Sequence, residues 1–219
     1  MLTDPEEIRI ISKARQKNVQ DPHRSRVHFT RIFSGFLENV KFEGSVLLDL
    51  GPGQYDFGVL AKQRGALTYG IDNDPAVIEL GNFKGFPVRY GNIKDMKVED
   101  FDTLFDGVFC KLSINAFWFH NDDQLLINHI KEIARLLKPG AWAWIAPWNG
   151  IPKKAELKKE DIRKMLFVQT EVFKQLGFIA FDLTEDISRY YGVHGDTANR
   201  PLFILNLNVP KSLRNCTKL

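Results

Sequence analysis

One stretch, SVLLDLGPGQYDFGVLAKQRGALTYGIDND at residues 45–74, constrains the fold of this chain more than any other. Its apolar run 45–50 predicts a strand buried on both faces, and Gly51 and Gly53 follow that run. Apolar positions in 57–63 have helical spacing, and a second predicted strand, 66–71, leads into Asp72. The order of strand, glycine turn, helix, strand and acid is half of a nucleotide-binding α/β fold.

The rest of the sequence continues the alternation of strands and helices. Further strands are predicted within 86–93, 103–114 and 141–148, and an amphipathic helix at 122–140 should end at Pro139 and Gly140. Asp4 and Pro5 should start a first helix. A second helix, up to Val40, carries too many apolar side chains for a free surface helix, so it should dock. A helix ending near 174–178 and two closing strands, 178–183 and 201–209, follow the core.

The composition limits the class of protein. A chain of 219 residues suffices for one α/β domain, and its net charge of +3 does not by itself indicate a nucleic-acid-binding protein. Two cysteines, Cys110 and Cys216, do not suggest a disulfide framework. No apolar run has the length of a membrane span, and the acidic start MLTDPEEIRI is unlike a signal peptide. We therefore expect a cytoplasmic protein without a membrane partner.

Five motifs occur in an order that resembles one known superfamily. They are LLDLGPGQY, YGIDND, YGNI, FDGVFCKLS and IARLLKPGAWAWIAPW, within about residues 45–148. In this order and spacing they resemble the class I S-adenosylmethionine-dependent methyltransferases. The resemblance implies a doubly wound, Rossmann-like sheet of seven mostly parallel strands whose last strand is antiparallel, and helices before the first strand that form a lid over the cofactor.

With this resemblance the chain is expected to form a single methyltransferase domain over 1–219, because no repeat, low-complexity tract or second core interrupts it. Its expected parts are an N-terminal helical lid at 1–42, a cofactor-binding α/β core at 45–148, a C-terminal helix with a closing hairpin at 149–209, and a tail at 210–219.

The resemblance also implies cofactor-binding residues at the strand ends. Gly51 and Gly53 would let the backbone approach the cofactor. Asp49 would hold the methionyl ammonium, and Asp72 would accept both ribose hydroxyls. The other implied contacts are Tyr55 in the cleft wall, Asn73 at the ribose or adenine, Asn92 and Ile93 at the adenine, and the backbone of Cys110 and Lys111 at the methionyl end.

Asp56 distinguishes this cofactor from a dinucleotide. The pyrophosphate-binding pattern G-x-G-x-x-G needs glycine at position 56, where Asp56 would place a negative charge near the phosphates. S-adenosylmethionine carries no phosphate, so Asp56 does not disfavour it. No G-x-x-x-x-G-K-[ST] motif occurs, which argues against a P-loop enzyme.

A metal is not predicted. In HNDD, 120–123, Asn121 suits a helix cap with Asp122 and Asp123 in the first turn. Metal-dependent members of the family carry carboxylates just after the fourth strand, where this chain reads CKLS. Cys110 fits a small buried residue better than a nucleophile.

Three regions would surround the acceptor: the lid helix, the segment after the fourth strand, and the loop between the last two strands. His194 and His28 are the candidate catalytic bases there, because histidine titrates near neutral pH. Other polar candidates are Asn115, His120, Tyr191 and Asp196. Aromatic side chains that could wall the pocket or belong to the core are Phe117, Trp118, Phe119 and Trp148.

The leading interpretation is metal-independent methyl transfer from S-adenosylmethionine to a small molecule, with oxygen as the favoured atom. The DNA-methyltransferase motif [DNS]PP[YF] and the PC nucleophile are absent after the fourth strand. An RNA-modifying enzyme stays open because of a basic cluster, Lys13, Arg15, Lys17, Arg24, Arg26 and Arg31, although such charges are more often a solvated helix face. A non-catalytic module that binds S-adenosylmethionine also stays open, and a homodimer is one option for the oligomeric state.

Overall fold

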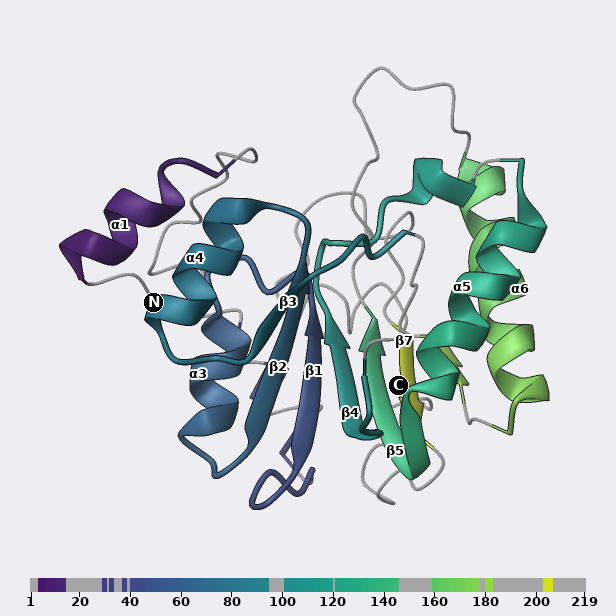
Figure 1. Cartoon of the computed structure of the whole chain (residues 1–219). Helices are drawn as coiled ribbons and strands as arrows, with labels where there is room; N and C mark the ends of the chain where they lie inside the picture. The colour runs from purple at the N-terminus through teal and green to yellow at the C-terminus, as the bar shows by residue number, and fades with distance from the viewer. Residues whose placement is uncertain are drawn as a thin grey trace.

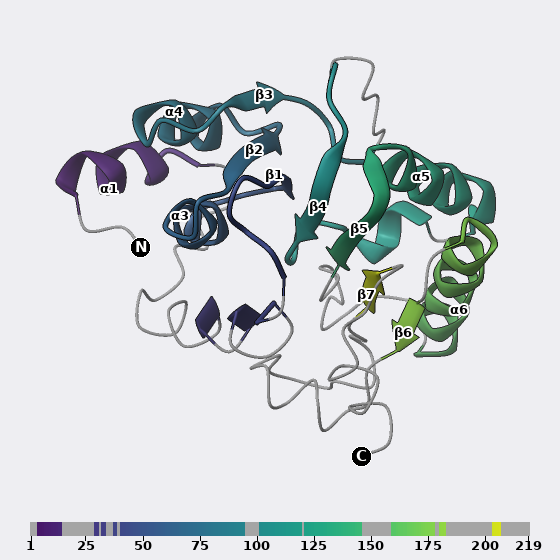
Figure 2. The same cartoon turned by 90° about the horizontal axis from the view of Figure 1, so that it is seen from below.

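The computed structural model of this chain describes residues 4–14, 29–30, 32–33, 37–38, 40–94, 101–119, 121–145, 159–177, 180–182 and 203–206. These residues form an open sheet with helices on both faces (Figure 1). Seen along the sheet, α1, α3 and α4 lie on one face and α5 and α6 on the other (Figure 2). The architecture is therefore a doubly wound α/β sandwich.

The central strands of the sheet are parallel. The strand order is β3-β2-β1-β4-β5-β7-β6. The parallel strands are β1 (Val46–Leu50), β2 (Leu67–Asp72), β3 (Val88–Tyr90), β4 (Phe105–Cys110) and β5 (Leu137–Ile145). Because the order reverses between β1 and β4, their carboxyl ends form a topological switch point, where open α/β sheets bind ligands. The predicted Rossmann-like fold with a parallel sheet is confirmed.

Two short strands continue the sheet beyond β5. β7 (Phe203–Asn206) pairs antiparallel with β5, and β6 (Ala180–Asp182) pairs antiparallel with β7. Both lie within the segments predicted as closing strands.

The helices begin where local sequence signals place them. They are α1 (Pro5–Ile11), α3 (Asp56–Lys62), α4 (Pro75–Phe83), α5 (Asp123–Arg135) and α6 (Lys159–Gln175), with a 3₁₀ turn, η1 (Ala116–Phe119). Asp4 caps α1 as predicted, and Asp74 caps α4; each carboxylate accepts a backbone N–H two residues on. None of the helices in the described part of the chain is long and apolar enough to cross a membrane.

The prediction that Pro139 and Gly140 end the long helix was wrong. α5 ends at Arg135, and both residues lie inside β5. The backbone N–H of Phe105 donates to the carbonyl of Leu136 at 2.8 Å, so pairing with β4 begins before the proline. The register then shifts between Phe105 and Gly107, and this irregularity accommodates the turn-forming pair.

The predicted cap of α5 was also displaced by one residue. Asp122, rather than Asn121, is the N-cap, and its carboxylate accepts from the N–H of Leu125 at 2.8 Å. Asn121 has a φ of +62°, a left-handed conformation that asparagine tolerates better than most residues.

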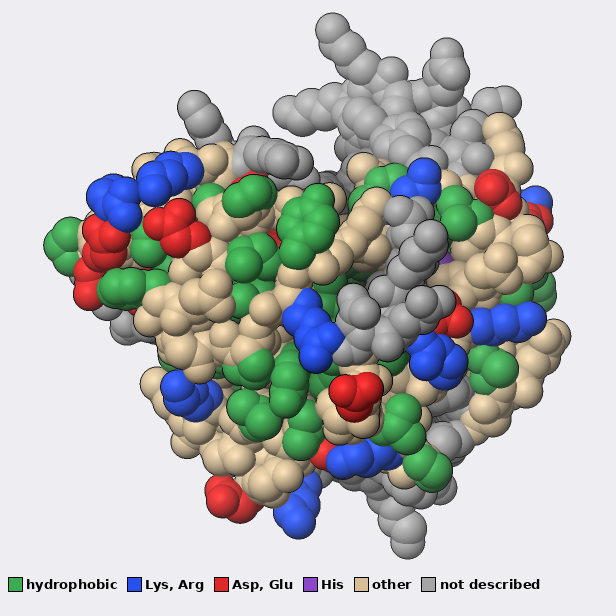
Figure 3. Space-filling view, viewed as in Figure 1, with side chains coloured by type: hydrophobic (Ala, Val, Ile, Leu, Met, Phe, Trp, Pro, Cys, Tyr) green, Lys and Arg blue, Asp and Glu red, His purple; other side chains and the backbone are tan. Residues whose placement is uncertain are grey.

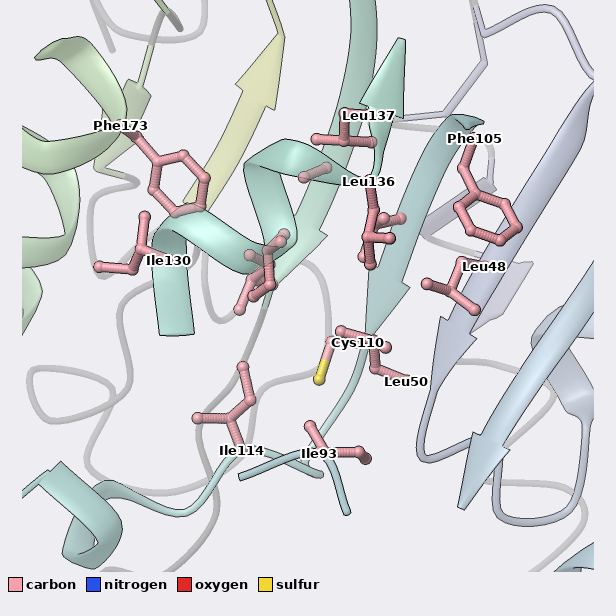
Figure 4. Packing of buried hydrophobic residues seen from close by; sticks show 14 of the residues in the cluster. Leu48, Leu50, Ile93, Phe105, Cys110, Ile114, Ile130, Leu136, Leu137 and Phe173 are labelled. Carbon is pink, nitrogen blue, oxygen red and sulfur yellow. The ribbon is translucent and has the colours of Figure 1, made fainter. Parts of the chain in front are cut away.

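Apolar clusters cover both faces of the sheet. One lies between the sheet and helices α5 and α6 and includes Leu48, Phe105, Ile130 and Phe173 (Figure 4). On the other face, the described N-terminal residues Phe29, Ile32, Phe33 and Leu37 pack with side chains of α3, β4 and β5. The prediction that this apolar segment docks on the core is confirmed for these residues.

Candidate functional site

The turn after β1 brings the backbone to the carboxyl end of the sheet. Gly51 has a φ of +72°, and its N–H donates to the Ile71 carbonyl at 2.9 Å. The Ser113 hydroxyl donates to the Gly51 carbonyl at 3.0 Å. A Cβ at position 51 would lie 2.2 Å from that hydroxyl oxygen, whereas a Cβ at Gly53 would meet nothing within 4 Å. Glycine at position 51 therefore permits both the left-handed backbone conformation and the close approach of Ser113.

A cavity of about 100 Å³ opens beside this turn. Its lining includes Asp49 at the end of β1, Lys111 after β4, and Gln54 and Phe29. The Lys111 ammonium lies 5.3 Å from the centroid of the Phe29 ring. The Gln54 Nε2 atom is buried and has no hydrogen-bond partner among the described residues, so a donor is available to a ligand here. The cavity thus combines a carboxyl group, an ammonium group and an amide donor.

Asp49 is the buried acid of this cavity. It is 2% exposed, and burial, reinforced by the charges of Asp72 and Asp56, raises its pKa well above the usual range. The nearby charge of Lys111 acts in the opposite direction. A cationic ligand group would therefore stabilise the ionised carboxylate.

Asp72 ends β2 at the same edge of the sheet. Its Oδ1 atom accepts from the N–H of Asp74 at 2.9 Å. Burial raises the pKa of Asp72 to about 6, partly offset by hydrogen bonds from the backbone of Asp74 and Asn73. A half-buried carboxylate at a strand end is a suitable acceptor for vicinal hydroxyls.

The turn after β3 lies against the glycine turn. The Gly91 N–H donates to the Asp72 carbonyl at 3.0 Å, and Asn92 Oδ1 accepts from the Lys94 N–H at 3.1 Å. Ile93 is buried and lies close to Leu50 and Ile114 (Figure 4). Its Cδ1 atom would be 3.2 Å from a Cβ at Gly51. The sequence-predicted residues from Asp49 to Ile93 thus follow adjoining carboxyl ends of β1, β2 and β3.

Cys110 ends β4 within the core. It is buried, and burial together with the charge of Asp49 raises the pKa of its thiol to about 12. The side chain is therefore a protonated core residue, in agreement with the sequence interpretation, and Lys111 rather than Cys110 lines the cavity beside the Gly51 turn.

Tyr55 requires a correction. Its side chain is 1% exposed, its ring stacks on Phe86 at 5.1 Å, and its hydroxyl donates to the Val77 carbonyl at 3.1 Å. The left-handed φ of +64° at Tyr55 accompanies this inward placement. The ring belongs to the core between the sheet and α4, so the prediction that it lines the cofactor cleft was wrong for the side chain.

The candidate acceptor residues are only partly described. His194, His28, His120, Tyr191, Asp196, Trp148 and the Phe117 side chain lie outside the described residues. Phe119 is fully buried and makes an edge contact with His129, with ring centroids 5.1 Å apart, so it is a core residue. Trp118 is partly buried beside it.

Two residues of the site were not identified from the sequence. His129 on α5 is buried, and its Nε2 lies 3.0 Å from the Ile93 carbonyl oxygen. Its position on the apolar face of α5, between Leu126 and Ile130, was a readable signal. Gln54 had none, because the burial of its amide depends on the tertiary structure.

No metal site is visible in the described part of the chain, where His, Cys, Asp and Glu side chains form no group of three or more able to hold an ion.

A larger cavity, of about 460 Å³, is lined by Phe42, Glu43 and Arg64 near the start of β1 and the end of α3. It therefore lies at the opposite end of the strands from Asp49 and Asp72.

The site fits a nucleoside joined to an amino acid. Asp49 and Lys111 face one small cavity with charges opposite to those of an ammonium and a carboxylate. Asp72 suits a ribose diol, and the Asn92–Ile93 turn offers an amide and an apolar side chain to a base. These are the parts of S-adenosylmethionine.

Comparisons with solved structures agree with this fold. The chain is similar to the N-methyltransferase NodS from Bradyrhizobium japonicum WM9 in complex with S-adenosyl-L-homocysteine (12% identity, 91% of this chain and 94% of that chain, TM-score 0.53). It is also similar to the amino pentose methyltransferase CalS10 from Micromonospora echinaspora (14%, 85% and 90%, 0.53). A third similar structure is magnesium protoporphyrin IX methyltransferase from Synechocystis PCC 6803 with bound S-adenosylmethionine (16%, 91% and 88%, 0.52).

At these identities the solved structures show the fold alone. No curated protein matches the chain. A family model described as a methyltransferase domain matches residues 48–145, the segment that holds the strand ends and turns of the site. The match, the fold and the site lead to one conclusion: this chain is an S-adenosylmethionine-dependent methyltransferase of the class I superfamily.

Proposed function

We propose that this enzyme transfers a methyl group to a small-molecule acceptor, without a metal, and that an oxygen atom is the first candidate for the methylated atom. The observation that carries the proposal is the cavity that sets Asp49 and Lys111 beside the Gly51 turn. S-adenosylmethionine, when bound, supplies an electrophilic methyl group on a sulfonium. The residues of this chain then have to orient the cofactor, hold the acceptor in line and exclude water.

The cofactor is proposed to lie along the carboxyl ends of β1 to β4. Asp49 would face the methionyl ammonium, and Lys111 with the unpaired Gln54 amide would face the carboxylate. Gly51, Gly53 and the backbone of Cys110 would border the methionyl chain. The remaining proposed contacts are Asp72 and Asn73 at the ribose, and Asn92 and Ile93 at the adenine.

Two observations support a small acceptor over a nucleic acid. On the face shown in Figure 3, Lys and Arg side chains are interspersed with Asp and Glu side chains rather than gathered in one patch. Lys13, the described member of the predicted basic cluster, lies 3.5 Å from Glu79.

The remaining organisation of the chain is part of this proposal. Residues 1–42 would act as the lid of a single domain, and β6 and β7 would be the family's closing antiparallel hairpin. Burial of Phe29 against Phe109, with ring centroids 6.0 Å apart, supports a lid that reaches the cofactor cavity. We also propose a cytoplasmic location, and a homodimer is one option for the oligomeric state.

His194 and His28 remain the proposed general bases for a hydroxyl acceptor. Replacing His194 by alanine should lower turnover roughly 100-fold, the scale of a general base, while affinity for S-adenosylhomocysteine stays unchanged. Steady-state kinetics and calorimetry on the same variant separate the two effects. Normal turnover would remove His194 from the chemistry, and the same pair of measurements on His28→Ala would then assign or exclude His28.

The function is tested by a screen of metabolite extracts for methyl transfer from methyl-labelled S-adenosylmethionine. The expected result is one labelled small molecule whose labelling falls strongly when Asp72→Ala replaces the wild-type enzyme at the same concentration and with S-adenosylmethionine below saturation. Label in an alcohol or carboxylate oxygen would support the oxygen assignment, and label on nitrogen would correct it. Label found only in RNA would contradict the small-molecule proposal.

A further inference from the structure

A buried histidine connects α5 to the turn after β3. His129 of α5 is 3% exposed and contacts Phe119, a member of the apolar cluster between the sheet and α5. Its Nε2 atom is 3.0 Å from the carbonyl oxygen of Ile93. A carbonyl oxygen only accepts, so Nε2 must carry the hydrogen. Burial lowers the pKa of His129 to about 4, although the Ile93 carbonyl acts against this shift, so the ring is neutral at physiological pH.

The orientation of the ring is fixed from a second side. The Phe119 ring of η1 meets the His129 ring edge-on, at 5.1 Å between centroids and an angle of 64°. The packing leaves the imidazole little freedom to turn away from Ile93. The N–H of His129 is therefore held in place before any ligand arrives.

The turn that receives this hydrogen bond adjoins the cofactor residues. The Gly91 N–H binds the Asp72 carbonyl, which fixes the start of the turn to β2. The Ile93 side chain reaches toward Gly51. The bond from His129 fixes the end of the turn to α5. The turn is thus held from both sides at the edge where Asn92 is exposed.

We propose that His129 is a positioning residue for the cofactor: through the Ile93 carbonyl it holds the Asn92–Ile93 turn in the geometry that binds the adenine. It does not touch the cofactor itself. This inference rests on the proposed placement of the adenine at that turn. Without the histidine, the buried Ile93 carbonyl would lose its donor, and the turn would have to move toward water to recover a hydrogen bond.

Two substitutions distinguish positioning from simple core packing. His129→Leu removes the donor and keeps an apolar side chain, whereas the amide nitrogen of His129→Gln can donate at a similar reach. His129→Leu should weaken S-adenosylhomocysteine binding about 3- to 10-fold and speed hydrogen exchange at residues 91–94. His129→Gln should have nearly wild-type affinity for S-adenosylhomocysteine and nearly wild-type hydrogen exchange at residues 91–94. Calorimetry measures the affinity, and mass spectrometry measures the exchange.

A matched control comes from the same helix. Ile133→Val trims a buried side chain of α5 that belongs to the same cluster and has no bond to the turn. It should lower the unfolding temperature without changing affinity for S-adenosylhomocysteine. If His129→Leu does not fold, His129→Met, which also lacks a donor and packs more adaptably, takes its place.

Wild-type affinity in the folded donor-less variant would overturn the positioning role and leave the proposed function intact. Equal weakening in the glutamine and leucine variants would also overturn it. Failure of the wild-type enzyme to bind S-adenosylhomocysteine would instead refute the proposed cofactor site.

Discussion

Replacing Asp72 by alanine should weaken the binding of S-adenosylhomocysteine by about 1.5–3 kcal/mol, roughly 10- to 100-fold. A carboxylate at the end of β2 that accepts two ribose hydroxyls makes charge-assisted hydrogen bonds, which the alanine variant lacks. The fold should lose little stability. The folded-state pKa of about 6 lies above the ordinary value, so any stabilising contribution of Asp72 is present at low pH and is lost as pH rises through 6. Calorimetric titration and thermal unfolding measure both quantities.

The same carboxylate gives the binding reaction a pH dependence. Ribose hydroxyls donate to the ionised form, so affinity should fall as pH decreases below about 6, where Asp72 becomes protonated. Asp72→Asn should lose this part of the pH dependence. Asp74→Asn is the control: asparagine also caps α4, so affinity at neutral pH should stay unchanged. Loss of the Asp74 charge, which raises the pKa of Asp72, should move the pH dependence to lower pH without removing it. Unchanged affinity in Asp72→Ala would show that another acid binds the ribose.

The second large effect concerns Gly51. Gly51→Ala should lower the free energy of unfolding by roughly 2–4 kcal/mol. An alanine with a φ of +72° is strained, and its Cβ would lie 2.2 Å from Ser113 Oγ and 2.4 Å from Ser113 Cβ. Since the Ser113 Cβ is fixed to the backbone, the loop after β4 must move, which should also abolish cofactor binding. Urea unfolding and calorimetry test these two outcomes.

Gly53→Ala is the matched control for this prediction. Its φ of +54° is also left-handed, but a Cβ there would meet no atom of the described residues within 4 Å. It should therefore cost only the backbone strain, about 1–2 kcal/mol. Equal stability losses in the two variants would contradict the importance of the contact between Gly51 and Ser113.

The sequence predicted those features whose signals are local. Gly51 and Gly53 between two apolar runs indicated the first strand, its turn and α3, and Asp74 followed by Pro75 marked the start of α4. These elements are found within one or two residues of their predicted places. The cofactor class followed from the resemblance of the motif set to the class I S-adenosylmethionine-dependent methyltransferases, and Asp56 argued only against a dinucleotide.

The sequence-based predictions failed where contacts between residues far apart in the chain determine the local structure. Pro139 and Gly140 are typical of a helix end, but the pairing of Leu137 with Phe105 makes them part of β5. Tyr55 occupies a turn beside the cleft in sequence, yet its stacking with Phe86 draws the ring into the core. His129 was overlooked because its partner, Ile93, lies 36 positions away in the chain. Local patterns contain no information on such partners.

The most direct test of the account is a calorimetric titration of the wild-type protein with S-adenosylhomocysteine and, separately, with NAD. Binding of S-adenosylhomocysteine at one site per chain, without detectable binding of NAD, is the predicted result, because Asp56 opposes phosphates while Asp49, Lys111 and Asp72 suit the parts of S-adenosylmethionine. Binding of NAD without binding of S-adenosylhomocysteine would contradict it.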